Sequence, residues 1–365
     1  MGTVPNPHEI ALGTGLGVGY NRGMVEVSVI VPVYNMEAGG KLEYCLDSLV
    51  GQTLQSLEII AVDDASPDGS AQIIKRYEER YPGRVVGICS PENRRQGGAR
   101  NLGLARAQGR YIGFMDADDW AAPDMFEKLL RKAVETGADV VGCDLCRVSS
   151  QTMVPTEREV CNLPEQTGVT DVQRRRSLLL LPGPVVTKLY ERRIFFDPPF
   201  RFQEHISYED NAAFLDLVMR YRHYEHVPEA LYFYYQNPDS TTHTYRMKSY
   251  EDRMSAMRVM LQDAARTGAL DAFREEVEYA FTDLFYRNTL FSYMLSPLKK
   301  DLRFLGALGR EMRETFPGFQ ENRYYKERVV AEEQELIRLH QKSTAAFLLY
   351  FQTKKLYRKI RYGRW

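Results

Sequence analysis

The segment from Arg110 to Trp120, Arg-Tyr-Ile-Gly-Phe-Met-Asp-Ala-Asp-Asp-Trp, is the most informative part of this chain. In it, an apolar stretch runs directly into three carboxylates, those of Asp116, Asp118 and Asp119. Carboxylates crowded at the tip of a buried strand repel one another unless a hard divalent cation or solvent neutralises them. The segment therefore indicates a cation site, with an Asx turn that caps the following helix as the alternative.

Two upstream segments have the same form, an apolar run that ends in polar residues. Residues 27–35 read Val-Ser-Val-Ile-Val-Pro-Val-Tyr-Asn, and residues 57–64 read Leu-Glu-Ile-Ile-Ala-Val-Asp-Asp. Nearly continuous apolar runs are typical of strands that are covered on both faces in a parallel sheet. Apolar residues at helical spacing follow each run, which predicts a helix after each strand.

The alternation of strand and helix continues along the chain. A third strand, a helix and a fourth strand are expected at residues 84–89, 96–105 and 110–115. This order predicts an α/β fold with a doubly wound, mostly parallel sheet, whose ligands lie outside the carboxyl ends of the strands. Both aspartate clusters, residues 63–64 and 116–119, fall at such ends.

Four motifs follow one another between residues 26 and 245. They are Val-Ser-Val-Ile-Val-Pro-Val-Tyr-Asn, Val-Asp-Asp-Ala-Ser-Pro-Asp-Gly-Ser, Gly-Gly-Ala-Arg-Asn-Leu-Gly-Leu and Phe-Met-Asp-Ala-Asp-Asp. Together they resemble glycosyltransferase family 2, the inverting nucleotide-sugar transferases with a GT-A fold. The resemblance implies a nucleotide-diphosphate sugar donor, a divalent metal (Mn²⁺ or Mg²⁺) held by the Asp-x-Asp element, and one carboxylate that acts as base.

Five residues are candidates for binding the donor nucleotide. In the family, the positions of Pro32 and Tyr34 line the base, with a strand cap and a surface tyrosine as the alternative. Asp64 is expected to accept a hydrogen bond from a uracil imide, because a base edge that offers an N–H needs an acceptor. Asp63 would point toward the ribose or inward. Arg100 would face the nucleotide or lie on a solvated helix face.

The Asp-x-Asp element is formed by Asp116 and Asp118, which share one face of an extended strand tip. Asp116 is expected to reach the ribose and the metal, and Asp118 to ligate the metal that bridges the diphosphate. Asp119 would orient the site or cap the next helix. His243 is a further candidate metal ligand, with a solvent-exposed loop histidine as the alternative. Lys188 is a candidate phosphate or acceptor contact, with a surface lysine as the alternative.

The segment Gln203-Glu-His-Ile-Ser-Tyr-Glu-Asp-Asn-Ala-Ala-Phe214 resembles the Glu-Asp element of the family. An inverting transfer needs a carboxylate that takes the proton of the acceptor hydroxyl as its oxygen attacks the anomeric carbon. The resemblance assigns this role to Asp210, with Glu209 as the second choice. The alternative is a helix N-terminus that carries acidic residues because of its dipole.

Composition places further bounds on the class of protein. The chain has 365 residues and a net charge of −1 at pH 7, which argues against a nucleic-acid partner. Its five cysteines are an odd number in mostly apolar segments, as expected for buried thiols in a reducing compartment. Cys143 and Cys146 could suggest zinc, but residues three apart in a strand face opposite sides. Without a secretory signal or an apolar run of bilayer length, a cytoplasmic enzyme is expected, at most attached to a membrane face.

The expected organisation has four parts: a flexible leader, a GT-A catalytic domain, a helical C-terminal domain and a basic amphipathic tail, at residues 1–26, 27–248, 249–343 and 344–365. Aromatic residues of the helical part at helical spacing indicate core packing or contacts in a homo-oligomer. The tail has six basic residues and no acidic one, with Phe347, Leu348 and Phe351 as the expected apolar face. Such a tail predicts a peripheral membrane contact, and a solvated terminus is the alternative.

Three classes of function remain open on the sequence alone. The first is an inverting glycosyltransferase for surface polysaccharide synthesis, with a nucleotide-sugar donor, most simply a UDP-sugar, and a glycan or lipid-linked acceptor. The second is a sugar nucleotidylyltransferase, although Tyr34-Asn-Met-Glu-Ala-Gly-Gly40 is a poor match to the phosphate loop of that class. The third is a non-catalytic partner in glycan assembly. The sugar, the nucleotide, the acceptor and the linkage are not specified by the sequence.

Overall fold

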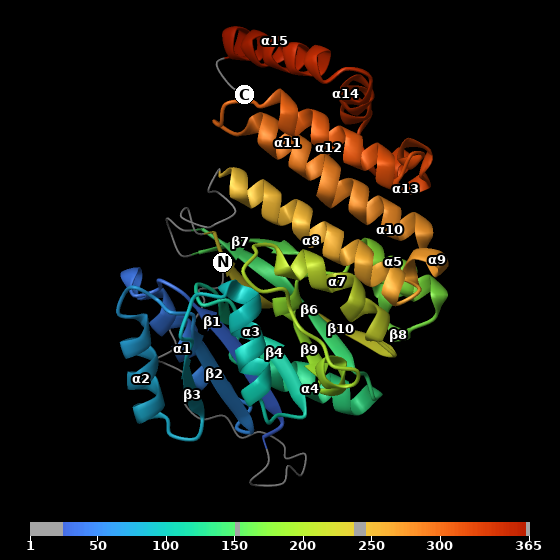
Figure 1. Cartoon of the computed structure of the whole chain (residues 1–365). Helices are drawn as coiled ribbons and strands as arrows, with labels where there is room; N and C mark the ends of the chain where they lie inside the picture. The colour runs from blue at the N-terminus through green and yellow to red at the C-terminus, as the bar shows by residue number, and fades with distance from the viewer. Residues whose placement is uncertain (1–24, 150–153, 237–245, 363–365) are drawn as a thin grey trace. The chain divides into compact units, whose positions relative to one another are not determined.

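The structure is a computed structural model that describes residues 25–149, 154–236 and 246–362, with side chains up to Lys354. The chain divides into two compact units, Met1–Ser240 and Thr241–Trp365. Figure 1 shows a sheet with flanking helices in the first unit and helices in the second. The expected leader, 1–26, and His243 lie largely or wholly outside the described residues.

The first half of the sheet is parallel and matches the predicted strands. It consists of β3, β2, β1 and β4, in this order across the sheet. Their bounds are Val85–Cys89, Leu57–Asp63, Val27–Val33 and Tyr111–Phe114. All residues of β1, β2 and β4 are buried, as the apolar runs predicted for strands covered on both faces.

The second half of the sheet is mixed. The short strand β9 (Lys188–Glu191) lies between β4 and β6 (Val140–Val148) and is antiparallel to both. Beyond β6, the long strand β10 (His223–Tyr235) runs parallel to β6. The remaining strands pair antiparallel: β5 and β8 with β10, and β7 with β6, with bounds Trp120–Ala121, Gly168–Val169 and Pro155–Glu159. These short strands carry too few residues for a periodic signal, so the sequence pattern does not predict them.

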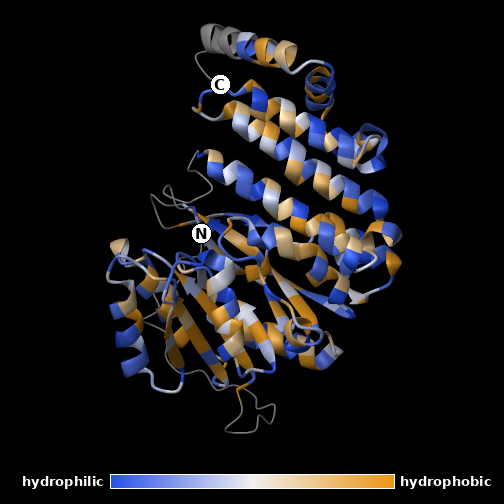
Figure 2. Cartoon of the chain, in the orientation of Figure 1, coloured by the Kyte–Doolittle hydropathy of each residue, from blue (hydrophilic) through white to orange (hydrophobic). Residues whose placement is uncertain are grey.

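Helices pack on the sheet through residues without side chains. In α3 (Arg95–Arg106), a Cβ atom added to Gly103 would lie 2.4 Å from Cγ2 of Ile30 on β1. In β4, a Cβ atom on Gly113 would lie 2.7 Å from the ring of Phe126 on α4. The other helices of this unit are α1, α2, α4, α5, α6 and α7, with bounds Lys41–Val50, Ser70–Arg80, Met125–Thr136, Val172–Leu180, Arg193–Phe196 and Glu209–Arg220. Figure 2 shows the apolar colouring concentrated on the strands.

The second unit is helical, as the sequence predicted. Its helices α8 to α15 have the bounds Met247–Arg266, Ala269–Ala272, Arg274–Phe281, Asn288–Leu295, Leu302–Thr315, Arg323–Arg328, Ala331–Lys342 and Thr344–Tyr362. A π-helical turn, Thr282–Arg287, joins α10 to α11. Phe281, Phe285, Tyr286 and Tyr293 are buried, so these aromatic residues form the core of the unit.

The last helix, α15, differs from the expected amphipathic tail. Phe347 is fully buried and Phe351 is 7% exposed, and the Phe347 ring lies 4.9 Å from the ring of His340 on α14. These two residues pack inside the unit because α15 lies against α12 and α14. They are therefore not a free apolar face, and this part of the prediction is corrected. In the described part of the chain, no helix combines the length and apolar character needed to cross a membrane.

Candidate active site

Two loops at the carboxyl ends of β1 and β2 are tied together by hydrogen bonds. The amide of Asn35 donates to Oγ of Ser66 at 3.1 Å, and the amide of Glu37 donates to Oδ2 of Asp68 at 2.8 Å. In return, the amide of Gly69 donates to Oε2 of Glu37 at 2.8 Å. The Ser-Pro-Asp-Gly-Ser motif thus builds a rim for the site.

Both residues predicted to line the nucleotide base belong to this region. Pro32 is buried within β1, whereas Tyr34, at the end of that strand, is 50% exposed. The exposed ring is open to a ligand, as stacking on a base requires.

Asp63 is the last residue of β2 and Asp64 follows it, and both are buried. Asp63 accepts a hydrogen bond from the amide of Ser66 at 3.3 Å, so it supports the turn that follows. One oxygen of Asp64 accepts from the amide of Arg94 at 2.8 Å, while its Oδ2 has no hydrogen-bond partner among the described residues. Burial raises the pKa of Asp64, although the Arg94 amide opposes this. Asp64 therefore keeps one buried carboxylate oxygen without a partner among the described residues, a type of acceptor that an N–H group can satisfy.

The Asp-x-Asp turn is held by a strand from the other half of the sheet. Asp119 is buried, and its carboxylate accepts from the hydroxyl of Tyr232 at 2.5 Å and from the amide of Tyr235 at 2.8 Å. The Tyr232 oxygen also accepts from the amide of Asp116 at 3.4 Å. Asp119 thus orients the site, and the alternative in which it caps α4 is excluded by these contacts. Asp116 and Asp118 remain partly exposed.

Arg100 connects this turn to the start of α7. Its guanidinium donates to Oδ1 of Asp116 at 3.2 Å and also pairs closely with Oε1 of Glu209. The side chain is 2% exposed and lies over the rings of Phe114 and Phe202, at 5.8 and 5.5 Å. Arg100 therefore does not lie on a solvated helix face, which corrects that alternative for this residue. It joins two carboxylate elements that lie more than 90 residues apart in the sequence.

The two acidic residues at the start of α7 have different environments. Glu209 is buried, and burial raises its pKa to about 7, with Arg100 opposing and Asp210 adding to the rise. Asp210 is exposed, and its Oδ1 accepts from the amide of Asn211 at 2.8 Å. The preceding residue, Tyr208, has a φ of 66°, so the chain turns sharply into the helix. Of the two carboxylates, only that of Asp210 is exposed.

Close packing of α3 against residues 202–209 sets this arrangement. A Cβ atom added to Gly97 would lie 1.9 Å from the carbonyl oxygen of Gln203, so only glycine fits at this position. Asn101 donates through Nδ2 to the carbonyl of Phe202 and accepts through Oδ1 from the Phe202 amide, both at 2.9 Å. The Gly-Gly-Ala-Arg-Asn motif thus anchors the segment that leads to Glu209.

The carboxylates of this region fit a hard divalent cation. Burial raises the pKa of Asp116, the charges of Asp118 and Asp210 raise it further, and Arg100 opposes both. Oxygen donors that repel one another at a partly open strand tip suit Mg²⁺ or Mn²⁺. In the described ranges, no three His, Cys, Asp or Glu side chains are grouped to hold a metal, so Asp116 and Asp118 would need ligand atoms from the donor or from elsewhere in the chain.

Lys188 is buried, whereas the sequence predicts an accessible lysine. The side chain is 1% exposed, and its amine donates to the carbonyl oxygen of Pro184 at 2.8 Å. Burial lowers its pKa to about 8, and nearby Cys161 and Cys143 oppose this. Because β9 lies inside the sheet, Lys188 is enclosed, and it is neither a surface lysine nor a residue in reach of a phosphate. His243 lies outside the described residues.

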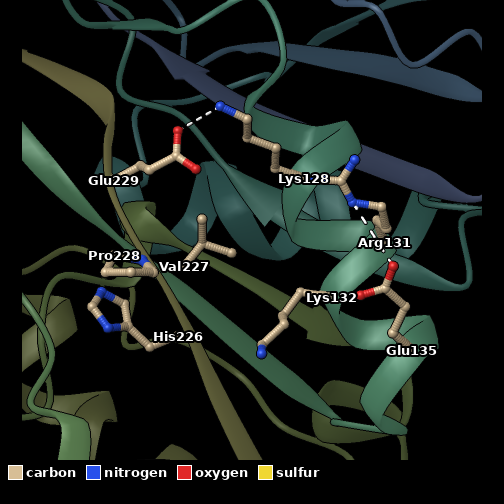
Figure 3. A pocket seen from close by; sticks show the side chains of 8 residues that line it. All are labelled: Lys128, Arg131, Lys132, Glu135, His226, Val227, Pro228 and Glu229. Atoms are coloured by element: carbon tan, nitrogen blue, oxygen red, sulfur yellow. Dashed lines mark hydrogen bonds and ion pairs between the residues drawn. The ribbon is translucent and has the colours of Figure 1, made fainter. Parts of the chain in front are cut away.

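One surface pocket lies away from these residues. It has a volume of about 180 Å³ and lies between α4 and β10. Its lysines are already paired, Lys128 with Glu229 at 2.5 Å and Lys132 with Glu225 at 3.4 Å. Figure 3 shows Lys128 directed toward Glu229 across the pocket. Because it contains none of the predicted site residues and its cations are neutralised, we do not assign it to the active site.

Comparison with known proteins agrees with this geometry. Residues 28–177 match the family model described as glycosyl transferase family 2. An uncharacterized glycosyltransferase of Haemophilus influenzae is 32% identical over 197 residues, which are 51% of this chain and 77% of that protein. The uncharacterized glycosyltransferase EpsJ of Bacillus subtilis is 34% identical over 219 residues, 59% of this chain and 62% of EpsJ. The matched part thus spans less than two thirds of EpsJ.

A solved structure shares the fold along most of the chain. It is S. aureus TarS 1–349, with a TM-score of 0.65, 21% identity and 93% coverage of both chains. The chain therefore belongs to glycosyltransferase family 2. The predictions of this family, of its enzyme class and of a GT-A-like fold with a helical C-terminal part are confirmed.

Tyr232 and Asn101 are parts of the site that the sequence pattern does not predict. Tyr232 lies in the aromatic run Leu231-Tyr-Phe-Tyr-Tyr235, and nothing in that run singles out one tyrosine. The signal that could have found Asn101 is its place next to Arg100 in the glycine-rich motif, one helical turn after Gly97 and Gly98.

Proposed function

We propose that this protein is an inverting glycosyltransferase that moves a sugar from a UDP-sugar to a hydroxyl group of a glycan or lipid-linked acceptor. The observation that carries the proposal is the link through Arg100, which brings the Asp-x-Asp turn next to the start of α7. The candidate site for the donor diphosphate and the exposed carboxylate of Asp210 are thereby parts of the same site. General base catalysis of transfer requires such an arrangement.

The donor nucleotide would bind along the carboxyl ends of β1 and β2. Tyr34 offers an exposed ring for the base, and Oδ2 of Asp64 offers an acceptor for an imide N–H. Asp63 supports the turn beneath the ribose. The choice of UDP is supported by a TarS structure of similar fold that was solved with UDP-GlcNAc.

Asp116 and Asp118 are the residues that would hold Mn²⁺ or Mg²⁺. When bound, the cation would stabilise the negative charge of the departing nucleoside diphosphate as a Lewis acid. The hydrogen bond between Asp119 and Tyr232 holds the Asp-x-Asp turn in place, and Arg100 orients the side chain of Asp116. In this proposal, Lys188 has no part in binding the phosphates.

In the transfer step, the acceptor oxygen attacks the anomeric carbon from the face opposite the diphosphate. The bond between that carbon and the diphosphate oxygen breaks, and the nucleoside diphosphate leaves with the electron pair. The hydroxyl proton passes to the carboxylate of Asp210, which is exposed at the first turn of α7. Glu209, buried and paired with Arg100, positions this turn and does not contact the acceptor.

The product class is proposed from relatives with named pathways. The succinoglycan biosynthesis protein ExoO of Rhizobium meliloti is 24% identical over 299 residues, which are 80% of this chain and 82% of ExoO. The minor teichoic acid biosynthesis protein GgaB of Bacillus subtilis is 30% identical over 224 residues, but these are only 24% of GgaB. Both names concern polymers of the bacterial surface, and we place this protein in the synthesis of such a glycan.

The proposal is tested by a panel of nucleotide sugars with Mn²⁺, followed by variants of the candidate base. Asp210→Asn should retain UDP binding and lower turnover by about two orders of magnitude, which is typical of removing a general base. Asp271→Asn is the matched control, because Asp271 is also an exposed acidic residue in the first turn of a helix. Loss of UDP binding in Asp210→Asn would show a structural role for this residue, and lack of turnover with every donor would contradict the proposed activity.

A further inference from the structure

Lys41, the first residue of α1, carries a charge that no other described residue neutralises. Its side chain is half-buried, and no carboxylate in the described ranges forms an ion pair with its amine. The other lysines of the first unit differ, since Lys75, Lys128 and Lys132 pair with carboxylates and Lys188 is enclosed. Because a partly buried charge is normally paired, the ammonium of Lys41 is available to an anionic ligand.

The packing of α1 places Lys41 at the edge of the candidate active site. Cys45 lies one helical turn after Lys41 on the same face of α1, and its thiol donates to the carbonyl oxygen of Asp116 at 3.6 Å. The ring of Tyr44 lies edge-on to Trp120, which directly follows the Asp-x-Asp turn, with ring centroids 4.8 Å apart. These two contacts fix the start of α1 beside that turn.

The ring of Tyr235 holds the amine of Lys41 on this side of the turn. The amine lies over the ring, 5.0 Å from its centroid, and an aromatic face attracts a cation. The amide of Tyr235 also donates to Oδ1 of Asp119 at 2.8 Å. The ring under the ammonium thus belongs to a residue that is bonded directly to the acidic turn.

A diphosphate at this turn would need a cation that the other site residues do not supply. Arg100 is buried and already pairs with Asp116 and Glu209, and Lys188 is enclosed in the sheet. Phosphoryl groups are commonly bound by lysine or arginine in addition to a metal ion, because their negative charge rises as the leaving group departs. Lys41 is the unpaired lysine beside the turn.

We propose that Lys41 binds the diphosphate of the nucleotide-sugar donor, with its ammonium donating a hydrogen bond to a phosphate oxygen. The inference rests on the proposed function and adds a residue that contacts the leaving group. When the bond to the anomeric carbon breaks, the electron pair stays on the diphosphate oxygen, and the fixed charge of Lys41 stabilises it. No proton leaves Lys41 in this step.

Equilibrium dialysis of the full chain with UDP and with uridine, in excess chelator, tests the proposal without the metal and without turnover. Lys41→Gln should raise the Kd for UDP roughly tenfold or more, the effect of losing a hydrogen bond to a charged group. The Kd for uridine, which has no phosphate, should stay the same. Lys41→Arg keeps the charge and should retain most of the UDP affinity, and the effect of Lys41→Gln should shrink at high salt.

Lys354→Gln is the matched control, because the amine of Lys354 also lies over a tyrosine ring, 5.8 Å from the centroid of Tyr350, in the other unit. It should bind UDP like the original protein. Unchanged UDP affinity in Lys41→Gln, or an equal loss of UDP and uridine affinity, would overturn the role of Lys41 and leave the proposed function standing. Failure of the original protein to bind UDP would contradict the proposed function itself, and the role of Lys41 with it.

Discussion

The hydroxyl of Tyr232 donates a hydrogen bond to the buried carboxylate of Asp119 at 2.5 Å, which ties β10 to the turn that carries the Asp-x-Asp element. Burial raises the pKa of Asp119 well above its usual range, as do the charges of Asp116 and Asp118, and Tyr232 counteracts the rise. A carboxylate that follows the candidate metal ligands directly thus has a structural partner and does not compete for the cation.

Tyr232→Phe should weaken the metal site without unfolding the protein. The variant loses the hydrogen bond to Asp119 and the acceptor of the Asp116 amide, and leaving a buried carboxylate oxygen unsatisfied costs about 1–3 kcal/mol. We expect a rise of about tenfold or more in the Mn²⁺ concentration needed for half-maximal turnover. Tyr234→Phe, a change on the same strand, is the control, and an equal effect in both variants would contradict a specific role for Tyr232.

Replacing Asp118 should abolish metal-dependent turnover. Asp118 is partly exposed beside Asp116, and the pair is the candidate ligand set. Asp118→Ala should therefore be inactive at any Mn²⁺ or Mg²⁺ concentration, with the fold retained by circular dichroism. Full activity of the original protein in excess chelator would remove the metal from the mechanism.

Arg100→Lys should impair the site although the charge is kept. A guanidinium can bind two carboxylates at once through its planar fork, whereas an ammonium is a compact point charge. Because Arg100 joins Asp116 to Glu209 in a buried position, we expect turnover to fall at least tenfold.

A double variant separates stability from activity at this ion pair. Above pH 7, where Glu209 is ionised, Arg100→Leu alone leaves this carboxylate buried without its cation, which costs about 3–5 kcal/mol for a buried pair. Arg100→Leu/Glu209→Leu should recover most of the stability in urea unfolding and none of the activity. If activity returned with stability, the pair would serve the fold alone.

Glu209 should make stability depend on pH between about 4.5 and 7. Burial raises its folded-state pKa to about 7 from 4.5, so the folded protein binds a proton in this range that the unfolded chain has released. Stability from this group is then full at low pH and falls as the pH rises to about 7. Urea midpoints of the original protein should decrease more steeply over this range than those of Glu209→Gln. Parallel curves would show that folding does not raise the pKa of Glu209.

The local features of this protein were determined by sequence. Apolar runs at residues 27–33 and 57–62 predicted buried parallel strands, because only such strands need apolar residues on both faces. The position of the aspartates after these strands placed the site at the carboxyl edge of the sheet. The family motifs could also be recognised from the sequence, because each is a short contiguous segment.

Tertiary structure decided which of these residues act together. Arg100 was recognised as a charged residue of a helix, but its two partners, Asp116 and Glu209, lie 16 and 109 residues away, and no local pattern encodes such distances. Lys188 is a second case in which tertiary contacts decide the outcome. Its local sequence suggested an accessible amine, but β9 lies between two other strands, and the side chain is buried there. Side-chain type is a local property, whereas burial and pairing depend on contacts between segments that only the folded chain brings together.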